Sequence, residues 1–192
     1  MNILAIDGSP RKEGTIATLL KIMCAELESA GCDVKQIKVS ELNIAPCTGC
    51  MSCRSLKKCV LAPDDSLRMI DAFVWADAFL IGAPCYWNNI PGPMKTMFDR
   101  MVYALMELSP RGIPCGLHKG KRALIVASST TPWPINRFTA TRGVIRNIKA
   151  ILDTAGIKTI GSIQKGGTAK KHTLSAAETA KAKRSVHRLI TR

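Results

Sequence analysis

The 192-residue sequence lacks the two best-known glycine-rich phosphate-binding motifs, because it contains neither GxGxxG nor the P-loop lysine motif. It also lacks an apolar run of membrane-spanning length. Its N-terminus has no basic region followed by a hydrophobic signal core. We therefore expect no membrane association and a cytoplasmic location.

Acidic and aromatic side chains are both scarce. The chain has 14 Asp and Glu against 28 Lys and Arg, a formal net charge of +14. Half of this excess lies in residues 164–192, which hold eight Lys and Arg and a single acid, Glu178. Such charge could attract an acidic redox protein, a phosphorylated cofactor or nucleic acid, although a solvated basic helix is the interpretation we favour. No aromatic side chain lies in this tail to stack on bases, so we expect no nucleic-acid partner.

Short apolar runs alternate with amphipathic segments along the chain, and these patterns predict buried parallel strands and helices respectively. Strands are expected at Asn2–Ile6, Val34–Val39, Ala78–Gly82, Arg122–Ala127 and Ile157–Ile163. Helices are expected at 16–27, 64–75, 94–105, 144–152 and 174–190. This alternation predicts one doubly wound α/β domain over residues 1–192, with a five-stranded parallel sheet in the flavodoxin-like order 2-1-3-4-5 and a cysteine-rich insertion at about 43–63.

Three local features lead to structural expectations. Met94, Met97 and Met101 share one helix face, which favours a core position or a subunit contact. Residues 109–120 are expected to form a connecting loop. The carboxylates of residues 64–65 are most simply N-cap groups of the helix that follows rather than catalytic acids.

The turn after the first strand suits an anion. Residues 7–15 place glycine, proline, hydroxyls and positive charge directly before a helix, where free backbone N–H groups and the helix dipole face the same point. Ser9 and Thr15 can add hydroxyl donors, and Arg11 can add a charged fork. A phosphate cradle and an ordinary βα turn with a cationic rim explain this turn equally well. In the predicted sheet order, it meets the loop 84–93 at the carboxyl edge of the sheet, where ligands bind.

Cysteine is abundant, with eight residues in the chain. In a protein with no sign of secretion, this number favours metal or redox chemistry over a disulfide framework. The pattern Cys47-x2-Cys50-x2-Cys53-x5-Cys59 lies in a segment without periodicity, where thiolates can wrap around one centre. The spacing favours a [4Fe–4S] cluster, whereas zinc more often takes two separated CxxC pairs. Free thiols or a disulfide remain alternatives.

Two motifs together resemble a known family. Gly8-Ser9-Pro10-Arg11, and Pro84-x-Tyr86-Trp87 followed by Pro93-Met94-Lys95-x-x-x-Asp99-Arg100, resemble the NAD(P)H-dependent FMN reductase family, and the cysteine pattern is similar to its iron–sulfur flavoprotein branch. The resemblance covers residues 1–130 well and the rest in outline. Relatives usually continue Gly-Asn-(Ser/Thr) after the arginine, whereas this chain has Gly14-Thr15-Ile16, which displaces the hydroxyl by one position.

The resemblance implies that FMN binds with its phosphate at Ser9, Arg11 and the 14–16 turn and with its isoalloxazine edge at backbone amides of residues 84–89. The expected cofactor-binding residues are Ser9, Arg11, Gly14, Thr15, Ile16, Pro84, Cys85, Tyr86, Trp87, Asn88, Asn89 and Ser128. The expected cluster ligands are Cys47, Cys50, Cys53 and Cys59. FMN is expected rather than FAD because there is no second dinucleotide fingerprint for an adenylate half.

The implied function is an FMN-dependent oxidoreductase that takes hydride from NADH or NADPH. Electrons would pass on, through the cluster, to a quinone, a metal ion, oxygen or an acidic carrier protein. No acid–base pair is evident near either loop, which suits a flavin enzyme because the cofactor carries the chemistry. A pure electron carrier and a thiol- or metal-based redox sensor are the alternatives. Trp87 and Trp133 lie on loops near the expected flavin edge, so we expect a homodimer or a homotetramer built from it.

Overall fold

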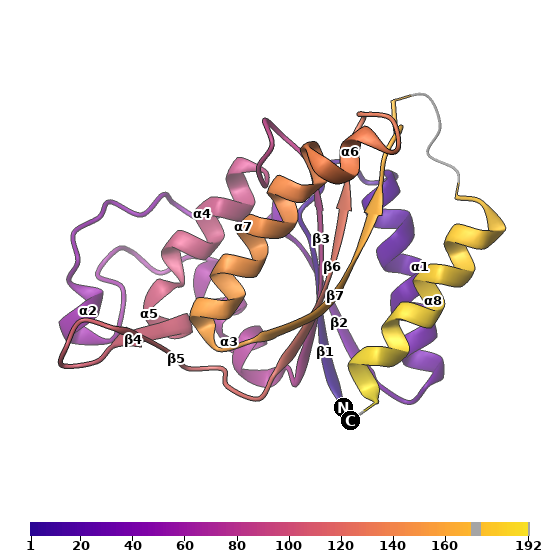
Figure 1. The fold of residues 1–192 in the computed structure, drawn as a ribbon. Helices are drawn as coiled ribbons and strands as arrows, with labels where there is room; N and C mark the ends of the chain where they lie inside the picture. The colour runs from indigo at the N-terminus through magenta and orange to yellow at the C-terminus, as the bar shows by residue number, and fades with distance from the viewer. Residues whose placement is uncertain (170–173, 192) are drawn as a thin grey trace.

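Five parallel strands form the central sheet of the computed structural model, which describes residues 1–169 and 174–191. Their order is β2-β1-β3-β6-β7 (Figure 1), which is the predicted order once the two short strands outside the sheet are set aside. The strands are β1 (Asn2–Asp7), β2 (Asp33–Lys38), β3 (Ala78–Pro84), β6 (Arg122–Ser128) and β7 (Lys158–Lys165). The flavodoxin-like doubly wound prediction is confirmed.

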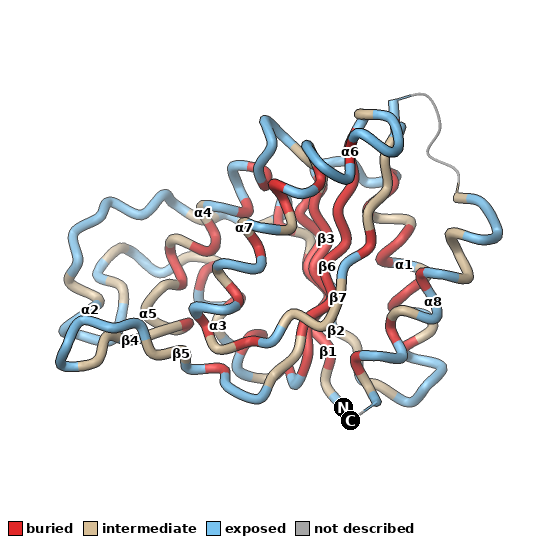
Figure 2. The backbone as a smooth tube through the Cα atoms, viewed as in Figure 1, coloured by how far each residue is buried: buried red, intermediate tan, exposed pale blue. Residues whose placement is uncertain are grey.

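Helices cover both faces of this sheet (Figures 1 and 2). On one face the buried side chains of α1 (Thr15–Ser29) and α8 (Ala176–Ile190) join those of the strands in one apolar cluster. On the other face, α3 (Ser66–Trp75), α4 (Gly92–Arg100) and α7 (Ala140–Ala155) form the second cluster. The helix predicted from residue 174 begins at Ala176, and residues 170–173 of the basic tail lie outside the described residues.

The central strands are apolar along their length because neither face of the sheet meets water. Ile3, Leu4 and Leu80 are each 0% exposed. Met94, Met97 and Met101 are also 0% exposed, which confirms the core interpretation of this stripe. These methionines therefore offer no surface strip to a second subunit.

A short antiparallel hairpin lies outside the sheet and was not predicted. β4 (Met106–Leu108) pairs with β5 (Pro114–Gly116), so the predicted loop over 109–120 is wrong at its centre. A Cβ atom on Gly116 would lie 2.3 Å from the backbone of Ala155, so only glycine lets this strand pass the end of α7. Strands of three residues are too short to show an alternating pattern in the sequence.

The predicted helix over 94–105 is interrupted at Met101, where α4 ends and α5 (Val102–Leu105) begins. The remaining short helices are η1 (Val39–Glu41), α2 (Cys53–Leu56) and α6 (Ile135–Phe138). Among the described residues, no helix combines the length and the apolar character needed to cross a membrane.

Candidate cofactor site and cysteine loop

Three loops begin side by side where β1, β3 and β6 end. Gly8 N donates a hydrogen bond to Gly82 O at 2.8 Å, and Cys85 N donates to Ser128 O at 2.7 Å. These bonds tie the loop after β1 to β3, and the loop after β3 to β6. The structure thus brings the two predicted loops together at the carboxyl edge of the sheet (Figure 1). Ser128 pairs with Pro84 at the same edge.

The first loop, residues 8–15, is called the phosphate cradle below. Its shape is set by its own polar groups, because Ser9 N donates to Asp7 Oδ1 at 2.8 Å and Arg11 N donates to Ser9 Oγ at 3.3 Å. Lys38, at the end of β2, donates a hydrogen bond from Nζ to Arg11 O at 2.7 Å. The loop is therefore held in one shape by the strands that flank it.

The N-terminus of α1 faces this cradle without a side-chain cap. Its N-cap residue, Gly14, has no side chain that could accept from the first N–H groups of the helix. The Thr15 hydroxyl is buried, and Oγ1 has no hydrogen-bond partner within the described part of the chain. The stem of Arg11 lies against Gly14, where a Cβ atom would be 3.2 Å from the Cβ of Arg11 and 3.8 Å from Ser9 Oγ. The open N–H groups at the start of α1, with the stem of Arg11 beside them, thus form a place suited to an anion.

Ile16 contributes differently from its predicted neighbours. Its side chain is buried against β3, because a Cβ atom on Gly82 would lie 2.7 Å from Ile16 Cγ2. Only the backbone N–H of this residue is placed to serve a ligand. Ile16 therefore fixes α1 on the sheet while its amide faces the cradle.

Asp7 lies beneath the cradle and is 1% exposed. Burial raises the pKa of its carboxyl, and this outweighs the hydrogen bond from Ser9 and the nearby charge of Lys38, whose Nζ lies 3.7 Å from Oδ2. This carboxylate shapes the loop but places a negative charge close to the anion position.

The second loop makes a tight turn at Tyr86–Asn89. Tyr86 and Asn89 exchange both backbone hydrogen bonds at 2.9 Å, and the two residues between them have left-handed backbones, with φ of 52° at Trp87 and 59° at Asn88. A left-handed backbone conformation costs about 1–3 kcal/mol per residue and is often found at functional sites. The Trp87 side chain is fully exposed, at 101%.

Asn88 holds this turn against α7. A Cβ atom on Gly143 would lie 2.0 Å from Asn88 O, so glycine in α7 makes room for the turn. Pro84 and Cys85 are half-buried below it, and burial raises the pKa of the Cys85 thiol. The turn is thus fixed at both ends while its tip projects into solvent.

All four predicted ligand cysteines line a cavity of about 690 Å³ that none of the cradle residues touches. It lies between the cysteine loop, defined as residues 43–63, and the helices α4, α5 and α7. Residues of α2 and β4 also line it, and Figure 1 shows these elements at the end of the molecule away from α1 and α8. Phe98, Leu105 and Ile151 contribute to its apolar wall.

The thiols share this cavity without converging on one point. Among residues 1–169 and 174–191, no group of three or more His, Cys, Asp or Glu is placed to hold a metal ion. Hydrogen bonds from Ser52 lower the pKa of the exposed Cys50 thiol, whereas burial, followed by the neighbouring thiols of Cys59 and Cys47, raises that of Cys53. Gly49 and Met51 have left-handed backbones, with φ of 69° and 63°.

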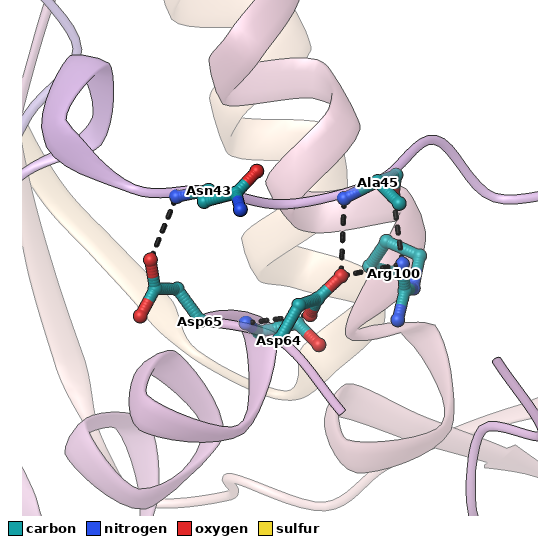
Figure 3. Close-up of polar contacts among 6 residues, drawn as sticks. Asn43, Ala45, Asp64, Asp65 and Arg100 are labelled. Carbon is teal, nitrogen blue, oxygen red and sulfur yellow. Dashed lines mark hydrogen bonds and ion pairs between the residues drawn. The ribbon is translucent and has the colours of Figure 1, made fainter. Parts of the chain in front are cut away.

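The predicted N-cap role of residues 64–65 is wrong for Asp65 and incomplete for Asp64 (Figure 3). Asp64 Oδ1 does accept from Ser66 N at 3.0 Å, but its Oδ2 accepts from Ala45 N at 3.0 Å. Asp65 Oδ2 accepts from Asn43 N at 2.7 Å and caps nothing. The Oδ2 atom of each carboxylate therefore accepts from a backbone N–H group at the start of the cysteine loop rather than from the end of the helix.

The profile of the family described as NADPH-dependent FMN reductase matches residues 1–151. The chain belongs to this family. An iron–sulfur flavoprotein of Archaeoglobus fulgidus is 36% identical over 104 residues, which are 53% of this chain and 46% of that protein. An FMN-dependent NADH:quinone oxidoreductase of Azospirillum brasilense is 30% identical over 142 residues, 67% of each chain. The chain spans about half the length of the curated iron–sulfur flavoproteins that it matches.

Solved structures share the fold of this FMN reductase family member at low identity. An NAD(P)H:quinone oxidoreductase from Methanothermobacter marburgensis superposes with a TM-score of 0.77 at 14% identity, covering 100% of this chain and 98% of that one. An FMN-dependent NADH-azoreductase from Bacillus anthracis in complex with FMN has a TM-score of 0.71 at 18% identity, covering 99% of each chain. These likenesses establish the fold over the full chain length.

The cradle residues fit the phosphate of the FMN that the family name implies. The start of α1 has no side-chain cap, so its first backbone N–H groups are available to a phosphate. Sequence reasoning gave no role to Ser129, which follows Ser128 at the same edge and whose buried Oγ has no partner among residues 1–169 and 174–191. The hydroxyl-rich run after β6 was the signal that could have found it.

The cysteine loop fits an iron–sulfur cluster by the kind and number of its donors. Four thiols on one loop line one cavity, and iron in such clusters takes four thiolates. The conformation described here does not bring their sulfur atoms together. Cluster binding would therefore need the exposed tip of the loop to close.

Proposed function

We propose that this protein is an FMN-dependent oxidoreductase that accepts hydride from NADH or NADPH. The observation that carries this proposal is the phosphate cradle, where the N-terminus of α1 has no side-chain cap and directly follows the loop of Ser9 and Arg11. Free backbone N–H groups and the helix dipole at such an end favour an anion such as a phosphate. Membership of the NADPH-dependent FMN reductase family supports FMN as that ligand.

The protein residues would bind and orient the cofactor. Ser9, Arg11 and Thr15 would hold the phosphate together with the backbone N–H groups of residues 14–16. The fixed turn at 86–89 would offer backbone amides to the isoalloxazine edge, with Ser128 on its other side. The bound flavin itself supplies the hydride chemistry.

We also propose that Cys47, Cys50, Cys53 and Cys59 ligate a [4Fe–4S] cluster. The shared cavity and the two-residue gaps between the first three thiols support this assignment. So does the name of the relatives that match the chain, iron–sulfur flavoprotein. A flavin that takes two electrons beside a cluster that takes one would make this protein a two-to-one electron converter.

The acceptor in this scheme is a quinone, a metal ion, oxygen or an acidic carrier protein. The names of two relatives support a quinone, since both are described as FMN-dependent NADH:quinone oxidoreductases. The net charge of +14 supports an acidic carrier equally. We propose the enzyme ahead of a pure electron carrier or a redox sensor.

Anaerobic stopped-flow mixing with NADH or NADPH separates these functions. An enzyme shows rapid bleaching of the bound flavin by at least one nicotinamide, whereas a carrier keeps its oxidised flavin spectrum until a reduced redox protein is added. A sensor shows neither change at a catalytic rate. Flavin that neither nicotinamide reduces would contradict the proposed activity.

A further inference from the structure

The two ends of the cysteine loop are joined to each other by backbone-to-carboxylate bonds. Asn43 N and Ala45 N at the first end donate to Asp65 Oδ2 and Asp64 Oδ2 at the second, at 2.7 and 3.0 Å. Asp65 N returns a hydrogen bond to Asn43 O at 3.2 Å. The four predicted ligand cysteines all lie between these two joined ends.

One side chain contacts both ends at once. Arg100, the last residue of α4, donates through one terminal nitrogen to Ala45 O at 2.8 Å and to Asp64 Oδ2 at 2.7 Å (Figure 3). Its side chain is 1% exposed, and its Nε is buried without a partner in the described part of the chain. Arg100 also contributes to the wall of the cavity that the four thiols line. It is therefore the internal connection between the cysteine loop and the body of the protein.

The loop has little else to hold it. Cys47, Cys50 and most residues around them are exposed, and α2 is only four residues long. The other ion pair of the loop, Lys57 with Glu107 at 2.8 Å, is about half exposed on both sides and contributes little. Ile44 packs against the core at the first end of the loop, and the contacts of Arg100 and the two carboxylates are the polar links that join this end to the second.

An arginine suits this position for physical reasons. A buried cation must be paired, and a guanidinium presents several N–H donors in a rigid plane, whereas a lysine offers one ammonium on a flexible stem. Hydrogen bonds from Ser66 and Ala45, and the charge of Arg100, overcome the effect of burial and hold the pKa of Asp64 below its ordinary value. The carboxylate thus stays ionised and keeps accepting from both segments.

We propose that Arg100 is a positioning residue for metal binding: by joining Ala45 to Asp64 it sets the spacing of the loop ends, so that the four thiols can reach one metal centre. The inference rests on the proposed metal-binding role of the cysteine loop. It also gives a role to Arg100, the last residue of the family-like motif, which lies outside the proposed FMN-binding residues. Arg100 touches neither cofactor nor substrate in this role.

Metal affinity of the full chain tests the proposal. Loss of a residue that holds a metal ligand in place without binding the metal itself lowers metal affinity by roughly 10–100-fold. Arg100→Lys and Arg100→Met should therefore lower the Zn²⁺ affinity of the iron-depleted chain, measured by competition with a chromophoric chelator, by roughly 10-fold or more. Iron retained after anaerobic purification should fall in the same variants, and FMN affinity should not change.

A double variant separates positioning from stability. Arg100→Met alone leaves the Asp64 carboxylate buried without its cation, which destabilises the fold. Adding Asp64→Asn removes that charge, so the melting temperature should recover while Zn²⁺ affinity stays low. Asp153→Asn is the control, because it breaks an exposed ion pair with Lys149 on α7, away from the cavity wall, and should alter neither quantity.

Each outcome decides one question. Zn²⁺ affinity that recovers together with the melting temperature, or that equals wild type in every variant, overturns the role of Arg100. Wild-type protein that retains no iron, but whose Zn²⁺ affinity depends on Arg100, supports this role and contradicts the proposed cluster. Loss of both iron and Zn²⁺ binding with unchanged FMN affinity supports both.

Discussion

At the scale of single residues, Thr15 carries a buried hydroxyl that has no hydrogen-bond partner among the residues that the structure describes. Thr15→Val removes this group and keeps the shape of the side chain. We expect two opposite effects. The cofactor-free protein should gain up to about 1 kcal/mol, a rise of roughly 2–4 °C in Tm, because a buried unsatisfied group is lost. FMN affinity should fall by about 1.5–3 kcal/mol, roughly 10–100-fold, because a hydrogen bond to a charged phosphate is lost.

Calorimetry of the cofactor-free chain and fluorescence titration with FMN measure the two effects. Thr18→Val, one turn along the same helix, serves as the control and should leave FMN affinity unchanged. Thr15→Val protein that binds FMN as tightly as wild type would remove this hydroxyl from the phosphate site.

Asp7 should make the stability of the protein depend on pH. Its pKa is raised in the folded state by burial, so its carboxyl stays protonated in the folded chain at pH values where the unfolded chain has already lost the proton. Wild-type stability should therefore fall as pH rises from about 4 through the folded-state pKa. Asp7→Asn keeps an acceptor for Ser9 N and removes the buried charge. Its Tm should exceed that of wild type at pH 7, and the gain should shrink as pH falls toward 4.

Thermal melts of both proteins between pH 4 and pH 8 check this expectation. A Tm difference that is the same at every pH would mean that the ionisation of Asp7 is not its cause. FMN should also bind more tightly to Asp7→Asn, because the variant has one negative charge fewer near the phosphate.

At the scale of elements, the cysteine loop should depend on its metal. Cys50→Ser removes one proposed ligand, so we expect loss of iron and of the associated visible absorbance, and faster hydrogen exchange over residues 42–63. FMN should stay bound, because the cradle and the 84–89 loop lie on separate elements. Iron and sulfide analysis beside a hydrogen-exchange map provides the measurement. Unchanged iron in Cys50→Ser would exclude this thiol as a ligand, and zinc without a visible band would identify a zinc site instead.

The elements also show how far the sequence predicts this molecule. Buried strands such as Ala78–Pro84 were predictable because their apolar runs are long and bounded by turns. The cradle and the cysteine loop were predictable because each is local in sequence. The role of Asp64 was not, since its partner Arg100 lies 36 residues away and only the fold brings them together. The β4–β5 hairpin was missed because its pairing depends on how the chain passes α7.

At the scale of the whole molecule, exposed aromatic side chains near the carboxyl edge of the sheet support self-association. Trp87 is 101% exposed, and Trp133 and Phe138 are 58% and 66% exposed. The guanidinium of Arg137 lies 5.9 Å from the Trp133 ring and 6.0 Å from that of Phe138. Such groups are costly surface for a monomer, so we predict a symmetric dimer or a tetramer built from it.

Sedimentation equilibrium at micromolar concentration measures the mass in solution, and Trp87→Ser should shift it toward the monomer. Val74→Ser offers a control, because Val74 is equally an exposed apolar side chain, at 66%, but lies on α3. A wild-type monomer at this concentration would contradict the prediction. The buried methionines of α4 take no part in it.

The central claim is that one chain holds FMN at the sheet edge and an iron–sulfur cluster on the cysteine loop. The most direct measurement is the visible spectrum of anaerobically purified protein, with flavin, iron and sulfide assayed on the same sample. We predict flavin bands above a broad iron–sulfur shoulder, FMN as the only flavin released, and iron and sulfide in equal amounts. FMN without iron would leave a simple FMN reductase, and a chain that takes up neither FMN nor iron would contradict the account.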